Sequence, residues 1–427
     1  MYMKTMKSVI LTTLVLLCWG CTMVLAQNPV PDSIMFANYD SAMFRKTYKL
    51  ANEIQAEAAK YNDNRGAAVA FGQIGDYENC LKYWDKEEYG DYVFPKEDSL
   101  EFLRYVPEYA TDYILERART EQVIMINEAT HNPMHRAYIL SLLQGLYDRG
   151  FRYLASEGLS FYDENVYRRG YPLKQSISGR YTDEPLAGDI VRTALKLGFI
   201  IVPYDKVEAG CTQKYSRDEC RQKREDNQAN NIASLLKENP NAKILVHASY
   251  GHIDERANAK VPMMAARFKT FTGIDPFTID QEFMTEHSEN KYEYPIYTLA
   301  ADLFQIKSPS YFASEDTMYN LNKDYCDLLV FHPRTKIENE RPLWMKLGGQ
   351  RTNFPMDLNG LKSGKEYLVQ AFPVGEDTFF GVPIDQFEVT DPKRPHDLML
   401  PYGDFVIRVL NRDAEVVKEF EITIARN

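Results

Sequence analysis

Imidazole and carboxylate side chains collect at the ends of several apolar segments of the chain, and four of its seven histidines belong to this set. Groups of these types can bind a divalent metal ion, or they can form a histidine and glutamate pair that takes a proton from water. The residues concerned are, in chain order, Glu128, His131, His135, Glu157, Asp205, His247 and His252. Their types and spacing therefore indicate hydrolytic or metal chemistry.

The apolar segments that precede these residues alternate with segments of helical spacing. We expect buried strands at 123–126, 151–155, 199–202 and 243–247, with further strands at 294–299 and 327–331. We expect helices at 133–149, 186–197, 217–237 and 261–272. Asn132 suits an N-cap, Pro133 a first helical turn and Gly198 a helix end. This alternation predicts an α/β domain over residues 115–335, with a mostly parallel sheet and helices on both faces.

The polar residues follow the carboxyl ends of the expected strands, where the crossover loops of an open α/β sheet form a crevice. Glu128 and His131 share one strand-to-helix loop and can point into the same crevice. A buried carboxylate at Glu157 is costly without a partner. His135 is either a second ligand or a cap of the helix start, and His247 is either functional or a hydrogen-bonded core residue.

Two stretches resemble a known superfamily, which joins erythromycin esterases, ChaN-type haem-uptake proteins and Tiki-type metalloproteases. NEATHNPMHRAYILSLLQGLYDRGFRYLASEGL, from Asn127, is similar to its opening motif, in which Glu and His follow the first strand and Glu the second. REDNQANNIASLLKENPNAKILVHASYGHIDE, from Arg224, resembles its second half, in which an arginine-led helix precedes a strand and a histidine-bearing loop. The resemblance covers about residues 115–285.

The resemblance implies a role for five residues of this chain: Glu128 and His131 as the signature pair, Glu157 as the second-strand acid, Arg224 as the helix arginine and His252 as the distal histidine. Asn127 stands where the family usually has Gly. Thr130 before His131 resembles the esterase branch, whereas His131-Asn132-Pro133 with His135 resembles the haem-uptake branch. We expect no transmembrane anchor of the Tiki type.

Three functions are compatible with these residues. The first is a hydrolase that acts on an ester or amide bond of a small-molecule or peptide substrate, with His131 as the base. It acts with or without one divalent metal ion. The second is an envelope protein that binds haem or iron for uptake without turnover, and the third is a structural module.

For the hydrolase, we expect the side chains of the four catalytic residues, Glu128, His131, Glu157 and His252, to converge on a common point. Glu128, His131 and His252 are the tentative metal ligands. Secondary roles toward the substrate or metal fall to His135, Asp205, Arg224 and His247.

The amino-terminal segment has the pattern of a secretory signal peptide. Lys4 and Lys7 precede an apolar run, and the expected cleavage follows Ala26, so residues 1–26 are removed. Alternatively, Cys21 is a lipidated cysteine. Either reading predicts a secreted, periplasmic or outer-membrane-associated protein with no transmembrane span after cleavage.

The remaining cysteines are expected in a compartment that permits disulfides. Cys211 and Cys220 flank a polar segment that a disulfide could close, and the alternative is two unpaired thiols. A zinc site is not favoured here, since neither cysteine belongs to a C-x-x-C pair.

Two flanking regions complete the organisation. Helical spacing at 39–60 and 65–84 predicts a tetratricopeptide-like helical hairpin within residues 32–95, with a packing role because a single repeat cannot form a solenoid. From 345 to 427, short segments of alternating polarity between turns predict a small antiparallel β-sandwich.

Composition excludes several classes of protein. With 44% hydrophobic and 26% charged residues, the chain is typical of globular proteins. The formal net charge is −11, and no sustained run of Lys and Arg occurs, so a nucleic-acid partner is not expected.

Overall fold

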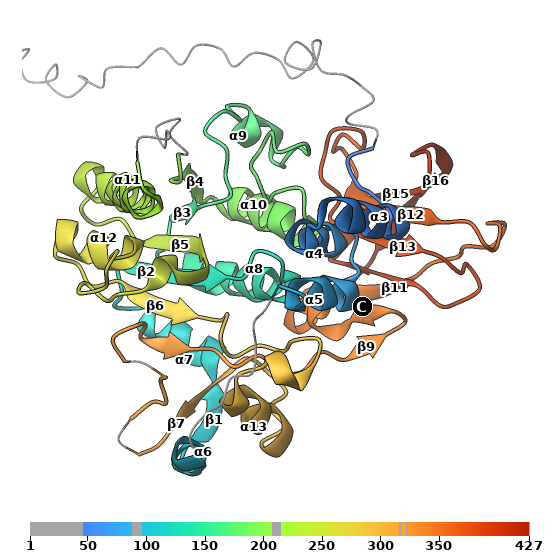
Figure 1. Cartoon of the computed structure of the whole chain (residues 1–427). Coiled ribbons are helices and arrows are strands. Elements are labelled where there is room, and N and C mark those ends of the chain that lie inside the picture. The colour runs from blue at the N-terminus through green and yellow to red at the C-terminus, as the bar shows by residue number, and fades with distance from the viewer. Residues whose placement is uncertain (1–45, 88–95, 207–214, 316, 322, 427) are drawn as a thin grey trace, which may run out of the picture. The chain divides into compact units, whose positions relative to one another are not determined.

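A six-stranded parallel sheet forms the centre of the computed structural model (Figure 1), which describes residues 46–87, 96–206, 215–315, 317–321 and 323–426. The strand order is β4-β3-β5-β2-β6-β8, and every neighbouring pair is parallel. The strands are β2 Val123–Glu128, β3 Tyr153–Ser156, β4 Ile200–Pro203, β5 Ile244–Ser249, β6 Phe277–Asp280 and β8 Leu328–Leu329. The predicted α/β class is confirmed.

Helices cover both faces of this sheet, because successive residues of a strand point to opposite sides. In β2, Ile124 and Ile126 belong to the core formed with α7, α8 and α10, whereas Val123 and Met125 belong to the core formed with α11, α12 and α13. The helices are α7 Ala110–Arg117, α8 Pro133–Asp148, α10 Pro185–Leu197, α11 Arg217–Glu238, α12 Met264–Thr272 and α13 Pro295–Leu303.

The helix boundaries follow the capping residues in the sequence. The side chain of Asn132 accepts a hydrogen bond from the backbone N–H of Met134 at 3.1 Å, and Pro133 occupies the first turn of α8. Gly198 ends α10 with a φ of 94°, a left-handed conformation that favours glycine. These caps fix where α8 and α10 begin and end relative to the strand ends.

Three helices of the described N-terminal region pack on the C-terminal sheet, where two were expected at 39–60 and 65–84, because the second expected segment is divided at Gly75. They are α3 Ala51–Tyr61, α4 Asn64–Gln73 and α5 Tyr77–Asp85. Gly75, with a φ of 74°, makes the turn between α4 and α5. Phe71 and Ile54 share a core with Leu368 and Leu410 of the C-terminal sheet, so these two ends of the described chain lie side by side (Figure 1).

The C-terminal region is antiparallel, as predicted. Four strands form a sheet in the order β13-β12-β15-β16, and a two-stranded sheet, β11 with β14, contributes to the same core. The strands are β11 Thr352–Pro355, β12 Tyr367–Pro373, β13 Asp385–Val389, β14 Asp397–Leu400, β15 Gly403–Asn411 and β16 Val416–Ile424. All described residues belong to one compact unit, so this sheet packs on the α/β part of the chain.

One expected strand is wrong. Residues 294–299 begin helix α13, with Pro295 in its first turn. The buried residues Ile296, Tyr297, Ala300 and Ala301 recur at helical spacing, which a short apolar run does not distinguish from a strand. The other late segment, 327–331, does supply strand β8.

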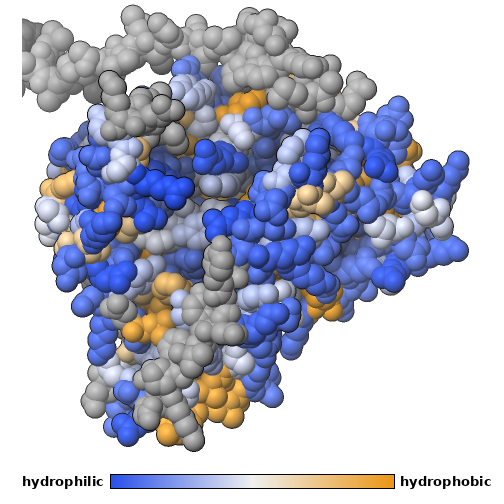
Figure 2. Space-filling model, viewed as in Figure 1, coloured by the Kyte–Doolittle hydropathy of each residue, from blue (hydrophilic) through white to orange (hydrophobic). Residues whose placement is uncertain are grey.

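The remaining elements of the described chain are short. They are α6 Lys96–Phe102, α9 Val166–Arg169, β1 Val106–Tyr109, β7 Ser310–Ala313, β9 Ile337–Glu338, β10 Arg341–Pro342 and the 3₁₀ helices η1 Tyr250–Ile253, η2 Asn290–Tyr292 and η3 Leu343–Gly349. In Figure 2 the visible face is mostly hydrophilic, with apolar residues gathered at its lower end over α6 and α13, where Leu100 and Leu303 are exposed.

The predictions for the amino-terminal segment, including Cys21 and cleavage after Ala26, lie outside the described residues. Cys211 does too, whereas Cys220 takes part in a disulfide bond. Cys80 and Cys326 are free and buried. Within the described ranges, no helix is both long enough and apolar enough to cross a membrane.

A buried ion pair between Arg351 and Asp189 joins the C-terminal region to α10. Arg351 Nη2 lies 2.6 Å from Asp189 Oδ2, with side chains 1% and 10% exposed. We expect Arg351→Ala to lower the free energy of unfolding by about 3–5 kcal/mol, because it leaves a buried carboxylate unpaired. Urea titration measures this. The exposed Arg394→Ala serves as the control and is expected to change little; equal effects of the two variants would contradict the prediction.

Candidate active site

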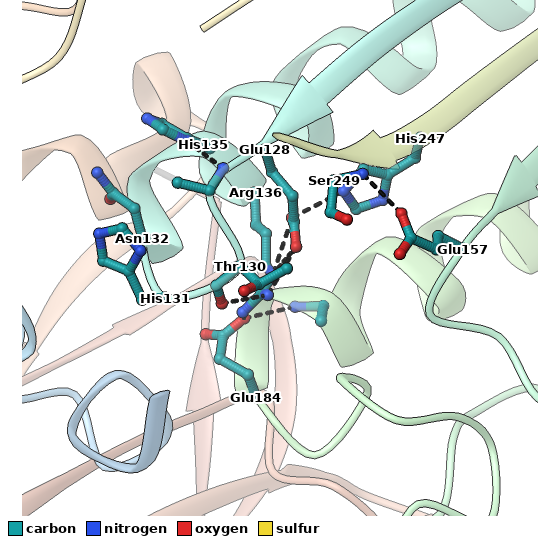
Figure 3. A network of polar contacts seen from close by, with 12 residues as sticks. Glu128, Thr130, His131, Asn132, His135, Arg136, Glu157, Glu184, His247 and Ser249 are labelled. Carbon is teal, nitrogen blue, oxygen red and sulfur yellow. Dashed lines mark hydrogen bonds and ion pairs between the residues drawn. The ribbon is translucent and has the colours of Figure 1, made fainter. Parts of the chain in front are cut away.

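The candidate site lies at the carboxyl ends of β3, β5 and β2, which are neighbours at the centre of the sheet. The parallel register places Glu128 beside Ser249, and Ser156 beside His247. Polar residues from three strands therefore meet at one edge of the sheet, and Figure 3 shows Glu128, His247 and Ser249 close together there.

Glu128 is the centre of a buried network of charges. Arg136, from α8, donates to both of its carboxylate oxygens, with Nη2 to Oε1 at 2.7 Å and Nε to Oε2 at 2.9 Å. His247 Nε2 lies 2.7 Å from Glu128 Oε2. Arg136 Nη1 also donates to Glu184 at 3.3 Å. All four side chains are buried, so their charges are balanced by one another rather than by water.

This network fixes the protonation of Glu128. Burial alone would raise the pKa of its carboxyl group, but the positive charge of Arg136 and the hydrogen bond with His247 lower that pKa to about 2. An ionised Glu128 can only accept a hydrogen bond, so His247 Nε2 carries the hydrogen and donates it, and in a neutral imidazole Nδ1 is then an acceptor. His247 Nδ1 lies 3.3 Å from Ser156 Oγ. The pair therefore leaves His247 Nδ1 available as a hydrogen-bond acceptor in this part of the site.

Glu157 organises a second group of charges beside the first. Arg224 Nη2 donates to Glu157 Oε1 at 2.6 Å and to Asp205 Oδ2 at 2.7 Å. The backbone N–H of Ser249 donates to Glu157 Oε2 at 2.8 Å. The structure thus brings together the predicted residues Glu157, Asp205 and Arg224, and it supplies the partners that a buried carboxylate needs.

His252 belongs to this second group. Its Nε2 lies 3.8 Å from Glu157 Oε1, and its Nδ1 lies 2.8 Å from Glu225 Oε2. Burial alone would lower the pKa of His252, but the hydrogen bond to Glu225 and the charge of Glu157 raise it overall. His252 is therefore held toward its cationic form and positions Glu157.

The structure does not bring His131 into either group, which corrects the predicted convergence of all four catalytic residues. Its ring stacks on that of Trp84 from α5, with centroids 3.9 Å apart, and Nδ1 is buried without a hydrogen bond. Cys80 Sγ donates to its backbone oxygen. Burial lowers the pKa of His131 well below its ordinary value. The imidazole therefore packs against the N-terminal hairpin, and Figure 3 shows it apart from His247 and Glu157.

His135 follows neither of the two alternatives expected for it, because the side chain that caps the start of α8 is that of Asn132 and both ring nitrogens of His135 have partners within the protein. Its Nδ1 accepts a hydrogen bond from the backbone N–H of Ala129 at 3.0 Å, and its Nε2 lies 3.4 Å from Thr285 Oγ1. The side chain is fully buried. His135 therefore holds the loop after β2 and has no lone pair directed at the crevice.

The tentative metal ligands do not form a site. Both oxygens of Glu128 are engaged by Arg136, and His131 faces Trp84 instead of the carboxylate. In the part of the chain that the structure describes, no group of three or more His, Cys, Asp or Glu side chains has the geometry to hold a metal ion. Glu128, His131 and His252 thus do not fit a shared divalent cation.

Two adjoining cavities lie over these groups. The inner cavity, of about 30 Å³, is lined by Glu128, Ser156, Glu157 and His247, and is large enough for a water molecule. The outer cavity, of about 310 Å³, is lined by Glu157 and Asp205 among others. Glu157 lines both cavities, so a molecule in the outer one lies next to the inner one.

Asn127 shapes the loop beside the site. Its amide donates to Asp280 Oδ2 at 2.6 Å and to the backbone oxygen of Tyr250 at 3.0 Å, and it accepts from the N–H of Gln281 at 2.8 Å. Tyr250 has a φ of 44°, which is strained for a residue with a side chain. Asn127 therefore ties β2 to the ends of β5 and β6.

Sequence reasoning missed three residues of the networks: Arg136, Glu184 and Glu225. Arg136 directly follows His135 in the first turns of a predicted helix, where its side chain can return to the strand end. Glu184 precedes Pro185 and caps α10 by accepting from the N–H groups of Leu186 and Ala187. The position of Glu184 before a helix-starting proline was a readable capping signal.

Comparisons with known proteins give distant structural likeness alone. No protein-family model and no curated protein matches the chain. The type III effector HopBA1 is 14% identical with a TM-score of 0.30, over 42% of this chain and 86% of that one. RRSP, a MARTX toxin effector domain from Vibrio vulnificus CMCP6, is 14% identical with a TM-score of 0.32, over 53% of this chain and 46% of that one. Similarity this low carries no argument about function.

The depressed pKa of Glu128 predicts how stability depends on pH. Because the carboxyl pKa is about 2 when folded and 4.5 in its ordinary state, the ion pair stabilises the fold fully above about pH 4.5. This contribution is lost as the pH falls toward 2. We expect Glu128→Gln to be less stable than the unchanged protein at pH 7, with the difference shrinking below pH 4.5. Urea titrations at several pH values measure this, with the exposed Glu116→Gln as the control, and a constant difference would rule the prediction out.

Proposed function

We propose that this protein is a hydrolase of the erythromycin esterase, ChaN and Tiki type, secreted or attached to the cell envelope, that cleaves an ester or amide bond. The observation that carries the proposal is that Glu157 borders both cavities, while the hydrogen-bonded pair of Glu128 and His247 lines the inner one. A substrate in the outer cavity can therefore meet a water molecule that the inner cavity holds.

His247, rather than His131, is the proposed base. Glu128 keeps the proton of His247 on Nε2, so that Nδ1 can accept a proton from water. The Glu128 carboxylate then stabilises the imidazolium that forms, as carboxylates do in other histidine-assisted hydrolases. When the tetrahedral intermediate collapses, the bond from the carbonyl carbon to the leaving oxygen or nitrogen breaks, and His247 gives its proton to the departing alcohol or amine. Proton transfer of this kind contributes about 10²–10⁴ in rate.

Glu157 and Arg224 have complementary roles in this proposal. A carboxylate oxygen of Glu157 accepts the second hydrogen bond of the water and directs its lone pair toward the substrate carbonyl carbon. Arg224 is 40% exposed at its side chain, so its guanidinium can approach the oxygen on which negative charge develops. Asp205 and His252 position these two residues through the contacts described above.

Haem binding remains the alternative from the resemblance, and the arrangement of the histidines gives it less support. His131 is stacked on Trp84, and His252 is engaged by Glu225. Neither imidazole is among the residues that line the two cavities over the site. A Soret band on haem titration that His131→Ala weakens, without turnover of any ester, would favour this alternative.

The test compares single variants on a panel of nitrophenyl esters and short peptides. We expect His247→Gln and Glu157→Gln to lower kcat by about 10²–10⁴, because they remove the base and the group that orients the water. His131→Ala is the matched control and should keep most of the activity. Circular dichroism and urea titration establish that each variant is folded.

Two outcomes would contradict the proposal. If His247→Gln is as active as the unchanged protein, the base is misassigned, and loss of activity in His131→Ala alone would restore the assignment made from the sequence. No turnover of any ester or peptide would reject hydrolysis.

Ser156→Ala tests which group is the nucleophile. The variant keeps its activity if water attacks the substrate, and it loses activity if the serine hydroxyl does.

A further inference from the structure

The outer cavity has a composition that restricts what it can bind. Its walls come from the segment between β3 and α10 and from the end of β4. Leu159 and Gly179 form an isolated bridge, and a side chain at Gly179 would collide with the backbone oxygen of Gly158. The backbone at Gly179 therefore packs directly against Gly158 and Leu159, and together they form part of the cavity wall. The volume of about 310 Å³ is at the lower end of the range for small-molecule sites.

Two cations that line this cavity have no ion-pair partner among the described residues. Arg180 and Lys206 are both exposed, and neither forms an ion pair with any residue that the structure describes. The acids of the same cavity, Glu157 and Asp205, are already engaged by Arg224. Because the formal net charge of the chain is −11, two unpaired cations in one cavity are a local reversal of the overall charge.

Aromatic side chains lie in the same cavity. Phe161, Tyr162 and Tyr181 line it, and Phe161 and Tyr162 are 38% and 78% exposed. Exposed aromatic rings of this kind offer a surface on which a flat apolar group can stack. The cavity therefore combines two charges for an anion with rings for an apolar group.

We infer that the outer cavity binds a small molecule that carries an anionic group, held by Arg180 and Lys206, and a flat apolar group, held by the aromatic rings. That this molecule is the substrate rests on the proposed hydrolase function. Its bond to be cleaved then lies toward Glu157, at the border with the inner cavity. A substrate with a carboxylate or phosphate is preferred over a neutral one of equal size.

The test pairs two esters of similar size, 4-nitrophenyl hydrogen succinate and the neutral 4-nitrophenyl butyrate. We expect a lower KM for the succinate, and Arg180→Gln and Lys206→Gln should each raise that KM about tenfold, with little change in kcat. The KM for the butyrate should not change. Lys196→Gln, an exposed cation of α10 outside the cavity, is the matched control.

A binding experiment separates this inference from the proposed function. Isothermal titration with benzylphosphonate, which has an anionic group and a ring but no ester bond, should show binding that Arg180→Gln and Lys206→Gln weaken about tenfold. If this binding is found but neither ester is cleaved, the result supports the anion site and contradicts the hydrolase function. If esters are cleaved with equal KM and the variants change neither KM nor binding, the inference is overturned and the hydrolase function stands.

Discussion

The buried ion pair between Glu128 and Arg136 is the interaction on which the candidate site depends. Removing two charges from water is expensive unless other groups complete their hydrogen bonds. Here Arg136 also donates to Glu184 and to the backbone oxygen of Thr130, while Glu128 also contacts His247. One strand end, the following loop, the start of α10 and the end of β5 are thereby fixed to each other.

The consequence for chemistry is that His247 is oriented by groups that cannot easily move. Its carboxylate partner, Glu128, is held by Arg136. Glu184 accepts a hydrogen bond from Arg136 and also caps the start of α10. A base held in this way needs little rearrangement when it takes a proton, which is the physical meaning of preorganisation. Hydrogen bonds of Asn127 and His135 add to this rigidity, because they hold the loop that follows β2.

The sequence contains enough information to locate the crevice but not to orient each side chain in it. Glu128, Glu157, Asp205 and His247 lie where they are expected, because a buried strand ending in a polar residue delivers that residue to the edge of a parallel sheet. The orientation of the His131 side chain cannot be predicted in this way. It depends on Trp84 and Cys80, which belong to a helix far away in the sequence and reach the loop only through tertiary packing.

The same distinction holds for the elements. Caps and alternation predict α8 and α10 well, because Asn132, Pro133 and Gly198 act on their own backbone neighbours. Residues 294–299 are a short and mostly apolar run, so the local pattern is compatible with both strand and helix. Burial of one helical face decides the outcome. Contacts between distant segments therefore decide what local spacing leaves open.

The charges around the crevice bear on how the proposed site would combine a base with an anionic substrate. Five carboxylates surround its inner part, Glu128, Glu157, Glu184, Asp205 and Glu225, against the guanidinium groups of Arg136 and Arg224 and the imidazole of His252. The inner part of the crevice thus carries an excess of negative charge around His247, the proposed base. The same excess repels a negatively charged substrate group. In the proposed binding mode such a group therefore lies in the outer cavity beside Arg180 and Lys206, with the neutral carbonyl carbon directed inward.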